Sequence, residues 1–238
     1  MSLACEYMDA AIGMGYGTTL TPVLLLLGLP PLVVVPSVLV GQLVGGITGG
    51  FTHWRIGNIS TGSDAKIILF LIAFGVVGAI FGAYCAVSIS TLALNIYIGS
   101  MVLAMGLLIL WQRNKVKRMS WKVLSAVGVL SAFNKGISGG GYGPLVTGGQ
   151  IISGRKVKSS IGSTTLAEVP ICAIALLFYF LLANPINGWI ILATCCGAGI
   201  AGPLAALTVR KVSSKHLVFF VSILTILLGM FTLIRVFI

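Results

Sequence analysis

Long apolar segments separated by short polar connectors follow one another along the chain. Six of them have about the 20 residues that an α-helix needs to cross the hydrocarbon core of a bilayer. They are Pro31–Thr52, Lys66–Ser88, Leu92–Trp111, Val157–Leu182, Gly188–Val209 and Leu217–Ile238. The pattern predicts an all-α, polytopic membrane protein with six helices that span the bilayer.

Two further apolar segments are interrupted by glycine, and they match each other without a gap. The matched positions are Gly13 and Gly139, Gly15 and Gly141, Tyr16 and Tyr142, Gly17 and Gly143, Ser37 and Ser163, and Gln42 and Glu168. A duplicated half with a broken apolar helix near its start is typical of transporters, whose binding sites lie at such breaks. We predict a first repeat at residues 1–112, a cytoplasmic linker at 113–122 and a second repeat at 123–238.

The composition excludes a soluble globular protein, because 58% of the residues are hydrophobic and only 8% are charged. The formal net charge of +11 does not indicate a nucleic-acid partner. Its basic residues lie in connectors between apolar helices, where they mark the cytoplasmic side of a membrane protein. The expected location is the plasma membrane, with the lipid bilayer as a partner.

The basic connectors also bear on how each half begins. If the first segment of each half crossed the membrane fully, Arg113–Lys122 and Arg155–Lys158 would lie on opposite sides, against the positive-inside rule. If each first segment enters and returns as a broken or re-entrant helical hairpin, all basic connectors are cytoplasmic. Each half then has three spanning helices and the halves are inverted repeats. Two parallel halves of four helices are the alternative.

Broken helices in a membrane expose backbone groups and positive half-helix N-termini, which favour an anion. We expect the two tips to meet near the midplane and to bind a small anionic substrate. The candidate substrate-binding residues are Gly15, Tyr16, Gly17, Thr18, Ser37, Gln42, Lys135, Ser138, Gly141, Tyr142, Gly143, Ser163 and Thr164. Alternatively, the glycines serve close packing, the tyrosines fill space, and the hydroxyls bond to their own helix backbone.

Ionisable residues at membrane depth are functional candidates because burying a charge in a bilayer is costly. Asp9 and Lys135 occupy matching places just before the two tips, where they form an ion pair or Lys135 attracts the substrate. Glu168 lies within a spanning segment and is a candidate for proton coupling or for a hydrogen-bonded structural role. Its counterpart Gln42 does not titrate.

The remaining polar residues do not indicate an enzyme. His53 stands beside Trp54 and Arg55 at a helix end and is interpreted as an interfacial anchor rather than a catalytic base. Neither a Ser/His/Asp order nor a metal-ligand cluster emerges. The sequence therefore predicts no catalytic residues, no metal and no cofactor.

Several motifs occur in the same order as in a known family. They are G-M-G-Y-G at 13–17, G-L-P-P at 28–31, H-W-R-I-G-N at 53–58, G-G-G-Y-G-P at 139–144 and G-S-T-T-L at 162–166. In this combination the chain resembles the sulfite exporter TauE/SafE family, also called the toluene-sulfonate uptake permeases. The resemblance covers nearly the whole chain. It implies a secondary transporter that moves small sulfur-containing anions, such as sulfite, sulfoacetate or other organosulfonates, often outward.

The expected function is therefore alternating-access transport, in the direction of export, of a small sulfur-containing anion. A carrier for another organic anion, an anion channel and a structural membrane protein are the alternatives. Coupling to a proton or to sodium is compatible with the sequence, as is assembly into a homo-oligomer.

Overall fold

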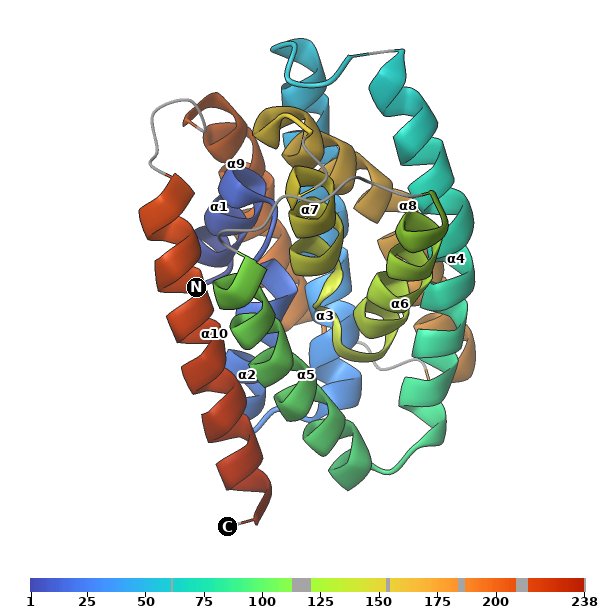
Figure 1. The fold of residues 1–238 in the computed structure, drawn as a ribbon. Helices are drawn as coiled ribbons and strands as arrows, with labels where there is room; N and C mark the ends of the chain where they lie inside the picture. Colours follow the sequence, from blue (N-terminus) through green and yellow to red (C-terminus); the bar gives the residue numbers. More distant parts are fainter. Residues whose placement is uncertain (61, 113–120, 153–154, 184–186, 209–213, 238) are drawn as a thin grey trace.

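A computed structural model describes residues 1–60, 62–112, 121–152, 155–183, 187–208 and 214–237, and within these ranges the chain forms ten helices and no strand (Figure 1). The helices are α1 (Ser2–Ile12), α2 (Tyr16–Leu26), α3 (Pro31–Arg55), α4 (Ser63–Ser88), α5 (Thr91–Gln112), α6 (Trp121–Ser138), α7 (Tyr142–Ile152), α8 (Val157–Leu182), α9 (Gly188–Thr208) and α10 (Ser214–Phe237). The fold is all-α, as predicted. Most of the predicted linker, residues 113–120, lies outside the described ranges, and residues 121 and 122 belong to α6.

Six of these helices are long and apolar enough to cross a membrane, namely α3, α4, α5, α8, α9 and α10. They coincide with the six predicted spans to within a few residues at each end. Large apolar side chains on them point outward, among them Phe81, Trp189 and Phe220, each more than half exposed. Such a surface suits hydrocarbon rather than water. The multi-pass membrane architecture is confirmed.

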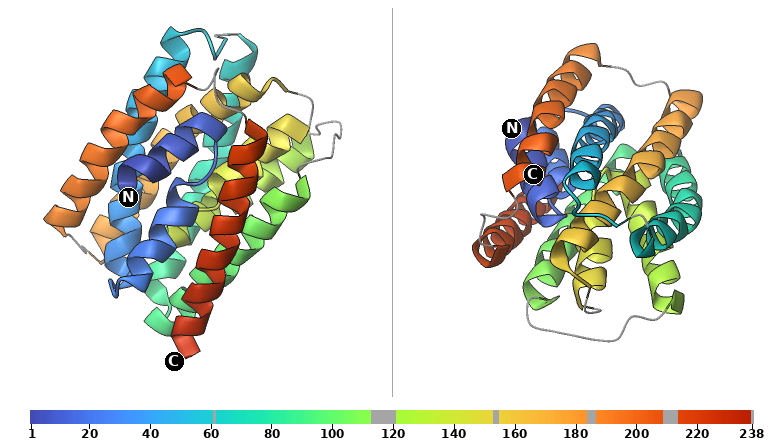
Figure 2. Two further views of the ribbon diagram at one scale, coloured as in Figure 1. Left: turned by 90° about the vertical axis from the view of Figure 1, so that its left-hand side faces the viewer. Right: turned by 90° about the horizontal axis from the view of Figure 1, so that it is seen from above.

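We name the two ends of the molecule after α3, which runs from the Pro31 end to the Arg55 end. In Figure 1 the Arg55 end is at the top. Helices α5 and α9 run in the same direction as α3, while α4, α8 and α10 run in the opposite direction. Figure 2 shows the resulting bundle from the side and from above.

The four remaining helices are short and form two pairs, α1–α2 and α6–α7. Each pair is broken by glycines in conformations that other residues rarely adopt: φ is +76° at Gly13 and +134° at Gly15, and it is +74° at Gly139 and +84° at Gly141. The chain can therefore reverse within three residues at each break. The predicted interruptions at the two Gly-Tyr-Gly motifs are present.

The α6–α7 pair enters the bundle from the Arg55 end and returns to it. Phe70 near the start of α4 packs on Trp121 at the start of α6, and Gln150 near the end of α7 bonds to Ser163 near the start of α8. The α1–α2 pair turns back in the opposite sense, since α2 ends at the Pro31 end, where its last carbonyls contact Arg235. This course agrees with two hairpins rather than two straight spans.

The packing partners of the two halves correspond. Helix α1 packs on α9 as α6 packs on α4, and α3 packs on α9 as α8 packs on α4. In the same way α2 packs on α3 as α7 packs on α8, while α5 and α10 pack on each other. Glycines lie at these interfaces, for example where Gly49 of α3 lies against the backbone of Gly202 of α9. The division into inverted repeats stays a prediction that this packing favours.

Candidate functional site

The two hairpin tips pass each other inside the bundle instead of meeting end to end at its middle. The tip of the first reaches the level of His53, since His53 Nε2 lies 3.2 Å from the carbonyl oxygen of Ala10. The tip of the second extends past it toward the Pro31 end, to Val38 on α3, which lies against Gly139. The two hairpins thus overlap over several residues. The expectation that the tips meet near the midplane did not include this overlap.

Glycine makes this overlap feasible because the two backbones touch. A Cβ atom on Gly17 would overlap the carbonyl oxygen of Gly139, and one on Gly143 would overlap the carbonyl oxygen of Gly13. Since Gly17 matches Gly143 and Gly13 matches Gly139, the same contact is made twice. These four glycines have a clear packing role, whatever else the tips do.

A buried polar network joins the two halves beside the tips. Gln42 Nε2 donates to Asp9 Oδ2 and to Glu168 Oε2, each at 3.0 Å. Lys135 donates to Gln42 Oε1, and its Nζ lies 3.4 Å from Glu168 Oε1. All four side chains are at most 6% exposed. Asp9 and Lys135 are therefore linked through Gln42.

The members of this network are the matched positions of the two halves, Asp9 with Lys135 and Gln42 with Glu168. They come from four different helices, α1, α3, α6 and α8. Charged groups are held in a dry interior only where hydrogen bonds and opposite charges compensate them. The network therefore fixes the relative position of both hairpins and of the two long helices that follow them.

The N-terminus of α2 already holds a carboxylate from its own half. The backbone N–H of Tyr16 donates to Asp9 Oδ1 at 3.3 Å, at the positive end of this helix. The residue that matches Asp9 before α7 is Lys135, which has no acceptor to offer. The two tips thus differ in charge: the first holds an internal anion, whereas the second has a cation at the matching position of the sequence, which bonds to Gln42 and Glu168.

Several buried hydroxyls near the tips have no hydrogen-bond partner. They belong to Thr18, Thr19, Thr21, Tyr142 and Thr147. Thr21 of α2 and Thr147 of α7 occupy matching positions, and each lies against the tip glycine of the other hairpin, Gly139 and Gly13 respectively. Buried polar groups are normally paired, so this set is available to bind a polar ligand.

The two tip tyrosines differ in their partners. Both side chains are fully buried, with 0% exposure. The hydroxyl of Tyr16 shares a hydrogen bond of 3.1 Å with Ser2 Oγ, whereas the hydroxyl of Tyr142 has no partner. Tyr16 is therefore part of the packing between α1 and α2, and Tyr142 keeps a free donor.

The other predicted hydroxyls bond within the protein. Ser37 and Ser138 donate to the carbonyl oxygens four residues before them. Ser163 Oγ donates to Gln150 Oε1 at 2.9 Å, and Gln150 Nε2 donates to Thr164 Oγ1 at 3.0 Å. Gln150 was not predicted, although it is a polar residue within the apolar segment of α7. It ties the second hairpin to α8.

The interpretation of His53 as an interfacial anchor is wrong. Its side chain is fully buried, and its Nδ1 lies 2.9 Å from Asn58 Nδ2. Because an amide N–H can only donate, Nδ1 accepts and Nε2–H donates to the carbonyl oxygen of Ala10. His53 therefore caps the end of α1, directly after Asp9. The H-W-R-I-G-N motif thus serves to hold the first tip.

Each hairpin is also tied to the opposite half where it leaves the bundle. At the Arg55 end, Arg155 after α7 forms an ion pair with Asp64 on α4, and Ser159 Oγ donates to the same carboxylate oxygen at 2.7 Å. At the Pro31 end, Arg235 of α10 donates to the carbonyl oxygen of Leu25 at 2.8 Å and to that of Leu26. A cation at a helix C-terminus stabilises its free carbonyls.

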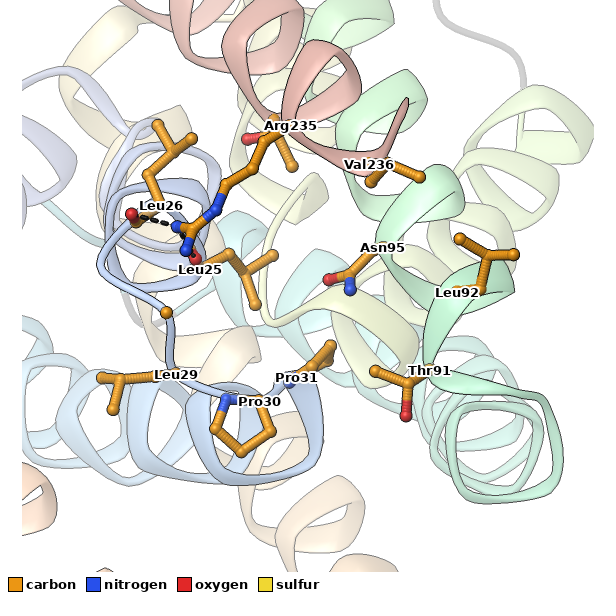
Figure 3. Close-up of a pocket in the computed structure, with 12 residues that line it drawn as sticks. Leu25, Leu26, Leu29, Pro30, Pro31, Thr91, Leu92, Asn95, Arg235 and Val236 are labelled. Carbon is orange, nitrogen blue, oxygen red and sulfur yellow. Dashed lines mark hydrogen bonds between the residues drawn. The ribbon is translucent and has the colours of Figure 1, made fainter. Parts of the chain in front are cut away.

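A cavity of about 390 Å³ lies beside this second tie (Figure 3). It is bounded by the end of α2, the start of α3, the start of α5 and the end of α10. Its polar groups come from Thr91, Asn95, Thr232 and Arg235. The cavity lies at the Pro31 end and so adjoins the exit of the first hairpin.

Six membrane-length helices around two broken hairpins, with a buried charged network between the halves, define a polytopic membrane protein of the transporter class. The chain belongs to the sulfite exporter TauE/SafE family, whose sequence profile matches residues 1–232. It is similar to the probable membrane transporter protein YtnM of Bacillus subtilis (strain 168). The two are 27% identical over 224 residues, which cover 89% of this chain and 73% of that protein. No solved structure matches the chain. The protein is a membrane transporter and not an enzyme.

Proposed function

We propose that the protein moves a small sulfur-containing anion, such as sulfite, sulfoacetate or another organosulfonate, across the plasma membrane by alternating access. The family description supports the substrate class. The two hairpins with their matched packing partners support a mechanism in which one half moves against the other around a site between them.

We further propose that the anion binds at the second tip. The observation that carries this proposal is the difference in charge between the tips. Asp9 occupies the positive end of α2, whereas the matching sequence position before α7 is Lys135. An anion at the N-terminus of α7 would meet the helix dipole, the Lys135 ammonium group and the free hydroxyl of Tyr142.

The tightly packed glycines favour a binding site that opens when the hairpins move over one that is permanently open. A backbone-to-backbone contact between the hairpins leaves no space for a ligand between Gly17 and Gly139. The unpartnered hydroxyls of α2 and α7 lie beside that contact. In the proposed cycle, the anion binds to them when the hairpins separate, and the glycine contact closes behind it.

The pair Tyr142→Phe and Tyr16→Phe tests the location of the site. Loss of a hydrogen bond to a charged ligand costs about 1.5–3 kcal/mol, so Tyr142→Phe should weaken anion binding roughly ten- to hundredfold. It should also leave the unliganded protein as stable or more stable, because a buried unpaired hydroxyl is removed. Binding is measured by thermal shift and calorimetry with sulfoacetate, sulfite, taurine and acetate.

Tyr16→Phe is the matched control, because the hydroxyl of Tyr16 has an internal partner in Ser2. It should lower the melting temperature and leave the affinity for the anion within about twofold of the parent protein. If Tyr16→Phe weakens binding and Tyr142→Phe does not, the site is at the first tip and the assignment is wrong.

A further inference from the structure

Glu6 is a third acidic side chain in the protein interior next to the buried network. It precedes Asp9 by three residues on α1, so both carboxyl groups lie on the same face of the helix. Glu6 is 1% exposed, and its Oε2 has no hydrogen-bond partner. The chain contains only four acidic residues, and three of them, Glu6, Asp9 and Glu168, are buried in this region.

The carboxyl group of Glu6 occupies space left for it by a glycine. A Cβ atom on Gly45 of α3 would overlap the Glu6 carboxyl group, with its Oε2 2.9 Å away. The matched position in the second half is Ile171, whose side chain is bulky, and the residue that matches Glu6 is Ala132. The fold therefore accommodates this acid at one place in one half only.

The charges around Glu6 do not balance. The groups that act on it are the carboxyl groups of Asp9 and Glu168 and the ammonium group of Lys135. Tyr16 of α2 and Cys5 of α1 also lie near it, and both are neutral at physiological pH. Three ionised carboxyls beside one ammonium group would leave a net buried charge of about −2, which a dry interior does not tolerate.

A proton on Glu6 reduces this net charge to about −1, and the site suits a proton better than a metal ion. Among the described residues, no three His, Cys, Asp or Glu side chains are placed so that they would hold a metal. A carboxyl group that lacks donors, by contrast, is neutralised by a single proton without any further ligand.

We propose that Glu6 binds and releases the proton that is coupled to transport. This inference rests on the proposed function for its connection to an anion. In the binding step, the ionised carboxylate of Glu6 takes up one proton from water and becomes a neutral carboxylic acid. In the release step it returns that proton. An anion near Lys135 adds a negative charge to the same region, so the bound anion and the bound proton stabilise each other.

The first test uses the protein without any substrate. Because the fold favours protonated Glu6, folded protein binds more protons than unfolded protein once the pH is above the ordinary range for glutamate. Stability should therefore fall as the pH rises from 5 to 9. In Glu6→Gln, which is neutral at every pH, the melting temperature in detergent should vary less with pH than in the parent protein.

The second test uses anion transport in proteoliposomes. Glu6→Gln should exchange sulfite or sulfoacetate across the membrane at close to the parent rate. It should fail to accumulate the anion in response to a pH gradient, whereas in the parent protein a gradient of one unit supports up to about tenfold accumulation. The combination of retained exchange and lost accumulation is not expected from a residue with a structural role.

The two tests separate this proposal from the proposed function. If the parent protein transports neither anion, the proposed substrate is wrong, and the pH dependence of stability still tests Glu6. Unchanged pH dependence of stability and unchanged accumulation in Glu6→Gln would overturn the assignment. A Glu6→Gln protein that does not fold would also contradict it, since a protonated carboxyl and an amide are both neutral and similar in size.

Discussion

At the scale of single residues, the interior of this transporter is organised by contacts that leave no room for a side chain. Gly143 lies in the first turn of α7, where a Cβ atom would overlap the carbonyl oxygen of Gly13. Gly149 lies later in the same helix, with nothing within 4 Å of the place where a Cβ would be. The two glycines differ in their surroundings but share the same secondary structure.

Alanine at these two positions should therefore have opposite effects. Gly149→Ala should be neutral or stabilise the protein by up to about 1 kcal/mol, because alanine favours the helix. Gly143→Ala should destabilise it by about 1–3 kcal/mol and lower the melting temperature by roughly 2–12 °C. Thermal unfolding in detergent measures both. Equal effects of the two substitutions would show that the hairpins do not touch at Gly13.

The match between the two halves made some of the site residues predictable from the sequence. Residues without a similar counterpart in the other half could not be found in this way. Asp9, Gln42, Lys135 and Glu168 stand at matched positions, and the structure brings all four together. Glu6 matches an alanine, so comparing the two halves gives no sign of it. The burial of His53 depends on how deeply the first hairpin tip enters the helix bundle. This depth is set by the folded molecule and cannot be inferred from the local sequence.

At the scale of secondary-structure elements, the two hairpins are the features that we propose to carry transport. Each reverses at positive-φ glycines. The sequence indicates both breaks through their clustered glycines, which have low helix propensity. Their overlap was not predictable, because it depends on contacts with the opposite half. The same holds for the arginine ties at Arg155 and Arg235, each of which joins a hairpin exit to a helix of the other half.

Single-cysteine labelling tests the course of the second hairpin. Cysteine is introduced at Lys122, Lys156 or Leu27 in a variant whose five native cysteines have been replaced. Since α6 enters and α7 returns at the Arg55 end, Lys122→Cys and Lys156→Cys should react with an impermeant thiol reagent from the same side. Leu27→Cys, at the Pro31 end, should react from the other side. Labelling of Lys122→Cys and Lys156→Cys from opposite sides would mean that the segment crosses the membrane.

At the scale of the whole molecule, the two halves of this transporter pack in corresponding ways around a shared charged network, and we propose that it works as a carrier. A carrier of this kind returns to its starting state faster with substrate bound than without it, and a channel has no such step. Duplication, apolar spans and basic connectors allowed the overall architecture to be predicted from the sequence. The proposed substrate class was indicated by the family resemblance alone.

Counterflow in proteoliposomes distinguishes a carrier for sulfur-containing anions from a channel. Vesicles loaded with a high concentration of unlabelled sulfite or sulfoacetate are diluted into a trace of the labelled anion. A carrier exchanges internal for external anion, so the label should rise transiently above its equilibrium level inside, and Tyr142→Phe should reduce this overshoot more than Tyr16→Phe. A monotonic approach to equilibrium, without an overshoot for any sulfur-containing anion, would contradict the account.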